Sequence, residues 1–111
     1  MTLQAELENF YGTQYYHRLT LTKIVCTDGV KFFAEKGEAF WCVDDMSIMA
    51  IKLNQPFLAI TVTAKNSKAK IVYTDGNNNI LKTKRYGYTT LADGEYNFYC
   101  TDDVLMLSSE Y

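Results

Sequence analysis

The sequence KIVCTDG, residues 23–29, recurs almost unchanged as KIVYTDG at residues 70–76. In both copies an apolar, β-prone run meets Thr-Asp-Gly, a combination that ends a strand and suits either a helix start or a turn. VKFFAEKG follows the first copy and NNN follows the second. We therefore interpret the two copies as one strand-exit signal with two outcomes, a helix and a hairpin. A divergent duplication is the less favoured alternative, because the similarity ends outside these residues.

Apolar residues recur at helical spacing both before and after the first copy. Asp28 is a candidate N-cap for a helix that Gly37 should end. Upstream, Thr2 is a candidate N-cap for a short amphipathic helix that carries Leu3, Leu7 and Phe10 and ends at Gly12. Downstream, apolar residues at helical spacing predict a longer helix reaching about residue 52, with this buried face: Ala39, Cys42, Val43, Met46, Met49, Ala50.

The period changes to two after Pro56, which predicts a series of β-strands. Residues 57–65 and 68–74 alternate apolar and polar side chains, and further strands are expected in residues 80–88, 95–101 and 104–111. One or two short strands are also expected between residues 13 and 27. The predicted fold is a single α+β domain over residues 1–111, with two or three helices packed on one face of an antiparallel sheet of four to five strands. The expected helix–sheet contacts are Met46, Met49, Leu58, Ile60, Val62, Ile71 and Tyr73.

The composition, with 48% hydrophobic residues and one proline, is typical of an ordered globular protein. The chain shows neither a signal peptide nor an apolar run of membrane-spanning length, so a soluble, cytoplasmic protein is expected. Its three cysteines lack metal-ligand spacing and sit among apolar or aromatic neighbours, which predicts buried thiols. We expect no cofactor and no metal site.

Several segments together resemble a known family: FYGTQYYHR, IVCTDGVKFFAEKGEAFWCVDD, YTDGNNNIL and the C-terminal LMLSSEY. Their order resembles that of an uncharacterised family, a domain of unknown function found in bacteria, phages and plasmids. The pattern combines GTxxYY, TDGVxxLAE and SEY over nearly the whole chain, and residues 47–54 depart from it. The resemblance implies an α+β fold and a mobile-element setting, and it supplies no catalytic residue.

Charge is distributed unevenly along the chain. Between Lys52 and Arg85 there are seven basic residues and one acid, Asp75, although the whole chain has a net charge of −2. Strand alternation predicts that five lysines share one outward sheet face with two tyrosines beside them, which suits contact with phosphates and bases. The candidate binding residues are Lys65, Lys68, Lys70, Lys82, Lys84, Arg85, Tyr86 and Tyr88. Lysines that only keep sheet edges soluble are an equally favoured interpretation.

The sequence favours a small non-catalytic interaction protein of phage or mobile-element origin that inhibits a host defence nuclease, as anti-CRISPR proteins do. The expected partner is a host nuclease or ribonucleoprotein in the cytoplasm. Direct contact with RNA is compatible with this interpretation, and no membrane association is expected. The sequence leaves open whether the protein is a monomer or a dimer. The alternative is a small hydrolase or metal-dependent enzyme using His17 and nearby carboxylates. Asp44 and Asp45 are assigned to the helix surface, because adjacent helical residues point about 100° apart. Secondary candidate residues are Tyr15, Tyr16, His17, Arg18 and Trp41.

Overall fold

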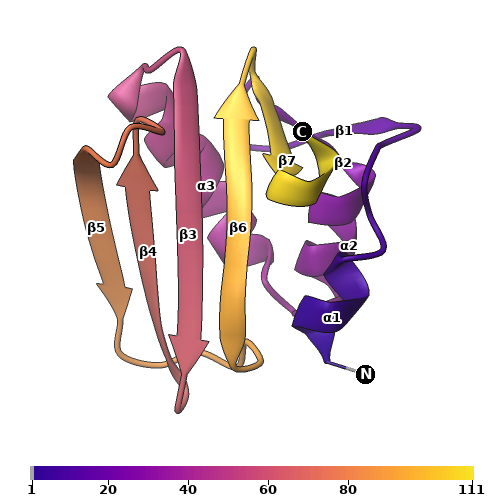
Figure 1. Ribbon diagram of the computed structural model, residues 1–111, viewed down its shortest axis with the longest axis vertical. Coiled ribbons are helices and arrows are strands. Elements are labelled where there is room, and N and C mark those ends of the chain that lie inside the picture. The colour runs from indigo at the N-terminus through magenta and orange to yellow at the C-terminus, as the bar shows by residue number, and fades with distance from the viewer. Residues whose placement is uncertain (1) are drawn as a thin grey trace.

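The computed structural model describes residues 2–111 and shows three α-helices packed against a β-sheet (Figure 1). The helices are α1 (Leu3–Leu7), α2 (Asp28–Lys36) and α3 (Phe40–Leu53). The strands are β1 (Tyr16–Arg18), β2 (Val25–Thr27), β3 (Phe57–Lys65), β4 (Lys68–Thr74), β5 (Ile80–Tyr86), β6 (Gly94–Thr101) and β7 (Val104–Leu107). The 3-10 turn η1 (Ser108–Glu110) follows β7. None of the helices in the described part of the chain has the length and apolar character needed to cross a membrane.

The strands form one sheet in the order β1-β2-β7-β6-β3-β4-β5. The predicted α+β class is confirmed, but the prediction of an antiparallel sheet of four to five strands is wrong. The sheet has seven strands and is mixed, since β2 and β7 run parallel. Val25 of β2 pairs with Val104 of β7, so this contact joins the two ends of the chain. Local periodicity carries no information about such a long-range pairing.

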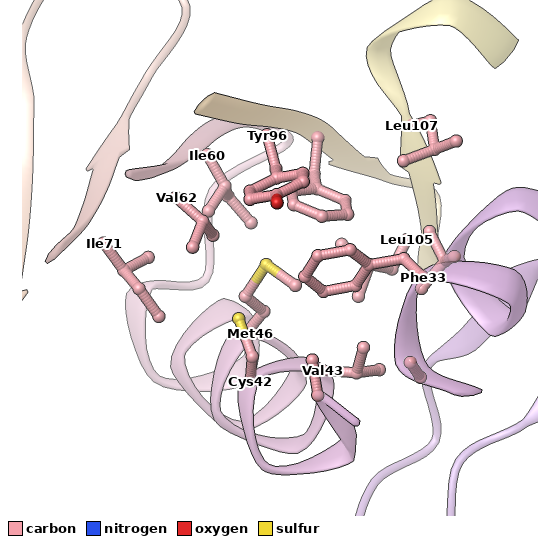
Figure 2. Packing of buried hydrophobic residues seen from close by; sticks show 14 of the residues in the cluster. Phe33, Cys42, Val43, Met46, Ile60, Val62, Ile71, Tyr96, Leu105 and Leu107 are labelled. Atoms are coloured by element: carbon pink, nitrogen blue, oxygen red, sulfur yellow. The ribbon is translucent and has the colours of Figure 1, made fainter. Parts of the chain in front are cut away.

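One hydrophobic core lies between the helices and one face of the sheet (Figure 2). The seven residues predicted for the helix–sheet contact are all buried, which confirms that prediction. Phe33 of α2 packs edge-on against Phe98 and at a tilt against Tyr96, both from β6. The three cysteines are free and buried, as predicted. Burial raises the pKa of Cys26 and that of Cys100 to about 11, so both thiols stay protonated at neutral pH.

The two Thr-Asp-Gly copies have the different outcomes that the sequence predicts. The first leads from β2 into α2, and the second forms the β4–β5 turn, where Gly76 (φ 88°) and Asn78 (φ 67°) have left-handed backbone conformations. Asp75 closes that turn by accepting hydrogen bonds from the backbone N–H groups of Asn77 (2.8 Å) and Asn79 (3.4 Å).

The helix boundaries follow the predictions with two corrections. The N-cap of α2 is Thr27, whose Oγ1 accepts from the N–H of Val30 (3.4 Å), and Asp28 is the first helical residue. The carboxylate of Asp28 is therefore available for other partners. Thr2 caps α1 as predicted, but α1 ends at Leu7, five residues before Gly12. Beyond Leu7 the chain continues in tighter turns, in which the Asn9 N–H donates to the Glu6 carbonyl (3.2 Å) and the Phe10 N–H donates to the Leu7 carbonyl (3.1 Å).

The C-terminus of the chain caps the N-terminus of α2. Glu110 accepts hydrogen bonds from the Thr27 hydroxyl (2.6 Å), the Gly29 N–H (3.2 Å) and the Leu107 N–H (3.0 Å). Gly29 is needed here for close approach, because a Cβ atom would lie 2.5 Å from Leu107 Cδ1 and 2.6 Å from Glu110 Oε1. The carboxylate satisfies free helical N–H groups and interacts favourably with the helix dipole.

Replacing Glu110 with alanine should lower the free energy of unfolding by about 2 kcal/mol, because two backbone N–H groups and one hydroxyl lose a charged acceptor. The matched control is Glu35→Ala, which removes an exposed carboxylate from the same helix and should cost less than about 0.5 kcal/mol. Urea denaturation measures both values. Equal losses would show that the contact with Glu110 contributes nothing specific.

Candidate functional site

The sheet face opposite the helices carries a cluster of cations. In Figure 1, α3 lies behind the strands, and the viewer looks onto the uncovered face of β3, β4, β5 and β6. Lys65 pairs with Lys68 across β3 and β4, and Lys70 pairs with Arg85 across β4 and β5. All four side chains are exposed, and none forms an ion pair within residues 2–111. We call these four residues the cationic face.

The pairing within the cationic face is unfavourable by itself. Residues directly opposite in an antiparallel pair have Cβ atoms about 5 Å apart, and like charges at that spacing destabilise the sheet. On its β6 side the cluster is bounded by Glu95, which lies opposite Thr63 of β3. The arrangement gives a local positive potential on a chain whose overall charge is negative.

A shallow depression of about 390 Å³ lies within the cationic face. Its lining comprises the four cations together with Thr63, Ala69, Tyr86 and Gly87. Gly87 adds no side chain, and a Cβ atom there would meet open space. Tyr88, in the loop between β5 and β6, is 74% exposed. In the same loop, the Thr89 N–H donates to the Ser67 carbonyl (2.7 Å) and so holds the loop against the β3–β4 hairpin. Tyr88 is thus at the same end of the sheet as Lys65 and Lys68.

The predicted placement of Lys82, Lys84 and Tyr86 on the outward face is wrong. Ile80 lies opposite Thr74, but Lys82 lies opposite Tyr73, so Leu81 forms a β-bulge that interrupts the alternation. Beyond the bulge, residues 83 and 85 point outward. Lys84 and Tyr86 lie opposite Ile71 and Ala69 on the helix side. The bulge therefore divides the predicted lysine cluster between the two faces of the sheet.

Lys84 and Tyr86 contact Asp45 of α3. Lys84 Nζ lies 2.7 Å from Asp45 Oδ1, and Oδ2 accepts from the hydroxyls of Tyr86 (2.7 Å) and Tyr73 (3.3 Å). Burial first and the Asp45 carboxylate second raise the pKa of Tyr73 and of Tyr86 far above the usual value. The Asp45 side chain is only 19% exposed, so its assignment to the helix surface is wrong. These contacts fasten α3 to β5, and Lys84 is already neutralised.

Trp41, a secondary candidate, belongs to the same region. Its ring lies 4.9 Å from that of Tyr86 in an edge-on arrangement. Trp41 is half-buried, and its contact with Tyr86 makes it a packing residue of the α3–β5 junction.

The remaining secondary candidates surround the start of α2. His17 Nε2 lies 2.8 Å from Asp28 Oδ1, and Asp28 Oδ2 accepts from the N–H groups of Gln14 (3.0 Å) and Tyr15 (3.4 Å). The hydrogen bond from His17, followed by that from Gln14, lowers the pKa of Asp28. The Asp28 N–H in turn donates to Thr13 Oγ1 (2.9 Å). Asp28 therefore anchors the segment before β1 to the helix.

A pocket of about 430 Å³ opens beside His17 and is lined by Tyr16, Arg18, Lys31 and Phe40 among others. Tyr16 lines this pocket, and Tyr15 and Tyr16 are both exposed. Within residues 2–111, Asp28 is the one carboxylate hydrogen-bonded to His17, because Glu110 is turned toward Thr27 and Gly29. No group of three His, Cys, Asp or Glu residues in the described chain could hold a metal ion.

Sequence reasoning missed an aromatic cluster on the uncovered face. Phe57, Tyr99 and Tyr111 pack together with ring centroids 5.0–5.8 Å apart. Tyr111 is 73% exposed, and Ile80 on the same side of the sheet is 67% exposed. Phe57 begins β3 and Lys65 ends it, so the aromatic cluster and the cationic face are separated by about 25 Å of strand. Phe57 and Tyr99 lie at alternating positions that face the same side of the sheet, so strand alternation could have indicated these two rings. Tyr111 follows the last strand, where alternation gives no information.

The chain was compared with known families, curated proteins and solved structures. The model of a family of unknown function (DUF6876) matches residues 1–111. No curated protein matches the chain, and neither does any solved structure.

Asp45→Ala should lower the free energy of unfolding by about 2 kcal/mol, because two tyrosine hydroxyls lose their acceptor and Lys84 loses its counter-charge. The exposed helical carboxylate of Glu35 provides the matched comparison, and Glu35→Ala should change stability by less than about 0.5 kcal/mol. Chemical denaturation followed by tryptophan fluorescence measures both. If Asp45→Ala is as stable as Glu35→Ala, the Asp45 contacts do not hold α3 to β5.

The lowered pKa of Asp28 predicts a dependence of stability on pH. The contribution of its carboxylate is fully present above the unfolded-state pKa of about 3.9, and is lost as the pH falls through the lower folded-state pKa. Asp28→Asn should therefore flatten the acid limb of the stability profile, measured by urea melts from pH 7 downward. Asp102→Asn, at an exposed turn, should keep the wild-type profile. Identical acid limbs for wild type and Asp28→Asn would contradict this.

Proposed function

Because the chain belongs to this family of unknown function, we propose its function from its surface: it is a non-catalytic binding protein that docks through the uncovered sheet face on an anionic partner. The observation that carries the proposal is the cationic face. Its four cations are paired with like charges across the strands and lack counter-ions within residues 2–111. Phosphates or carboxylates of a partner would remove that repulsion, so complex formation relieves a cost present in the free chain.

The uncovered face offers two kinds of contact. The cationic face supplies long-range attraction and orientation, which act mainly on the rate of association. The aromatic cluster at the opposite end supplies apolar surface of the kind that contributes most to affinity. Such a bipolar surface suits one extended partner better than a small molecule.

We propose a host nuclease or ribonucleoprotein as the partner, inhibited in the manner of an anti-CRISPR protein. The support for this class is the resemblance to proteins of phages and plasmids together with the small size of the chain. The proposed site of action is accordingly the cytoplasm of the host. A net charge of −2 argues against a general nucleic-acid binder, so RNA contact would occur within a protein-directed complex.

The alternative, an enzyme using His17, receives less support. His17 forms a hydrogen bond with one carboxylate, Asp28, which is also the acceptor for two backbone N–H groups. Within residues 2–111 His17 is hydrogen-bonded to no second carboxylate, so a mechanism that pairs it with a separate acid finds no partner in direct contact.

Reversing the four cations of the cationic face to glutamate should abolish capture of a host nuclease or ribonucleoprotein from lysate, detected by mass spectrometry. The control reverses four other lysines, Lys23, Lys31, Lys36 and Lys82, and changes the net charge equally. It should retain the partner. Both variants should fold, since exposed charges contribute little to stability. Binding by wild type should also weaken as salt rises.

If the cationic-face variant retains the same partner as wild type, these cations only keep the sheet soluble and the proposal fails. Ribonuclease treatment of the lysate separates the two sources of anionic charge. Capture that survives it comes from a protein surface, and capture that is lost comes from bound RNA.

A further inference from the structure

The outer side of α3 carries apolar residues that stay partly or largely exposed within residues 2–111, with Ile48 half-buried. The buried side of the helix is centred on Met46, and Ile48 points about 160° away from it. Phe40 and Ile51 lie about 60–80° to one side of this outward line and are 54% and 42% exposed. A helix that covers a sheet is usually polar on its outer side. We call Phe40, Asp44, Ile48, Ile51 and Lys52 the outer α3 face.

The outer α3 face continues into the loop between β1 and β2. Leu21 of this loop is 61% exposed, and together with Ile48 and Ile51 it lines a groove of about 440 Å³. The lining of the groove is mainly apolar and also includes Lys23 and Lys52. The surface therefore combines apolar side chains with charged ones, as protein–protein interfaces do.

The charges on the outer α3 face are arranged symmetrically. Asp44 precedes Ile48 by four residues, and Lys52 follows it by four. About 12 Å of helix separates them, too far for an ion pair within one copy. Neither side chain has an oppositely charged partner within residues 2–111.

We propose that the outer α3 face is the interface of a symmetric homodimer, in which α3 packs antiparallel against α3 of a second copy with the two-fold axis at Ile48. A two-fold axis there brings residue 44 of each copy opposite residue 52 of the other. Asp44 and Lys52 then form two equivalent ion pairs around an Ile48–Ile48 contact. An unrelated partner would not need charges placed symmetrically about one apolar residue, whereas an isologous interface requires self-complementarity.

Helix packing geometry agrees with this arrangement. Residues 40, 44, 48 and 52 form one ridge at a spacing of four, and two such ridges pack into each other at a crossing angle of about −50°. At that angle only the middle of each helix is in contact, which is where Asp44, Ile48 and Lys52 lie. Phe40 and Ile51 are then left to contact the flanking β1–β2 loops.

The dimer leaves the uncovered sheet faces free, because α3 lies on the opposite side of the sheet (Figure 1). A dimer would therefore present two cationic faces, and a partner with two sites would bind with avidity. The inference itself depends on α3 alone and does not require the proposed function.

Charge reversal tests the proposal, with mass measured by light scattering after size exclusion and dimer dissociation measured by analytical ultracentrifugation. Wild type should have the mass of two 12.7 kDa chains. Asp44→Lys and Lys52→Asp should each weaken the dimer at least about tenfold, because like charges then face each other. An equimolar mixture of the two variants should form a heterodimer, since a doubly basic helix then faces a doubly acidic one and both ion pairs are restored, one in its original orientation and one reversed. The double variant Asp44→Lys/Lys52→Asp should form a homodimer again.

Glu35→Lys and Lys36→Asp are the controls, because they make the same charge changes at exposed positions of α2 and should keep the wild-type mass. Circular dichroism verifies the fold of each variant, and if Asp44→Lys does not fold, Lys52→Asp alone still decides the question. A monomeric wild type, dimeric single variants, or a mixture that stays monomeric would each overturn the proposal. The four-cation variant of the sheet face should remain a dimer, so the two proposals fail independently.

Discussion

The capping of the α2 N-terminus ties segments from both ends of the chain to the core of the fold. The first N–H groups of a helix have no partner within the helix, and here they are satisfied by residues from both ends of the chain. Thr13 accepts from Asp28 and Glu110 accepts from Gly29, while the Asp28 carboxylate holds the segment before β1. The GTxxYY, TDG and SEY segments, on which the family resemblance rests, meet at this place. The parallel pairing of β2 with β7 is adjacent to it and depends on the same closure.

A second constraint divides the basic residues by role. The bulge in β5 turns Lys84 toward Asp45, where the charge stabilises the junction with α3, and leaves Arg85 beside Lys70 on the uncovered face. One residue more or less in β5 would exchange these positions. The same seven-residue strand thus contributes one neutralised cation to the architecture and one uncompensated cation to the surface. Only the uncompensated cation can contribute favourable charge to a partner.

The two surfaces identified here lie on opposite sides of the molecule and differ in chemistry. The uncovered sheet face has cations at one end and aromatic rings at the other, whereas the outer α3 face has an apolar centre between one acid and one base. The first is complementary to an anionic surface, and the second is complementary to itself. This separation would let the proposed dimer form and the proposed partner bind without competing for one surface.

The local structure follows from short-range patterns in the sequence. Helical spacing identified α3 and its buried face from Cys42 to Met49, alternation identified β3 and β4, and the residues after each Thr-Asp-Gly distinguished a helix from a hairpin. These features depend on neighbours within a few residues, which is the range of periodicity and turn chemistry. Only the tertiary structure decided that β2 joins β7, that Glu110 caps α2, and that Lys84 meets Asp45. Each of these contacts joins distant segments, and a single bulge reverses which face a side chain occupies, so no local pattern could specify them.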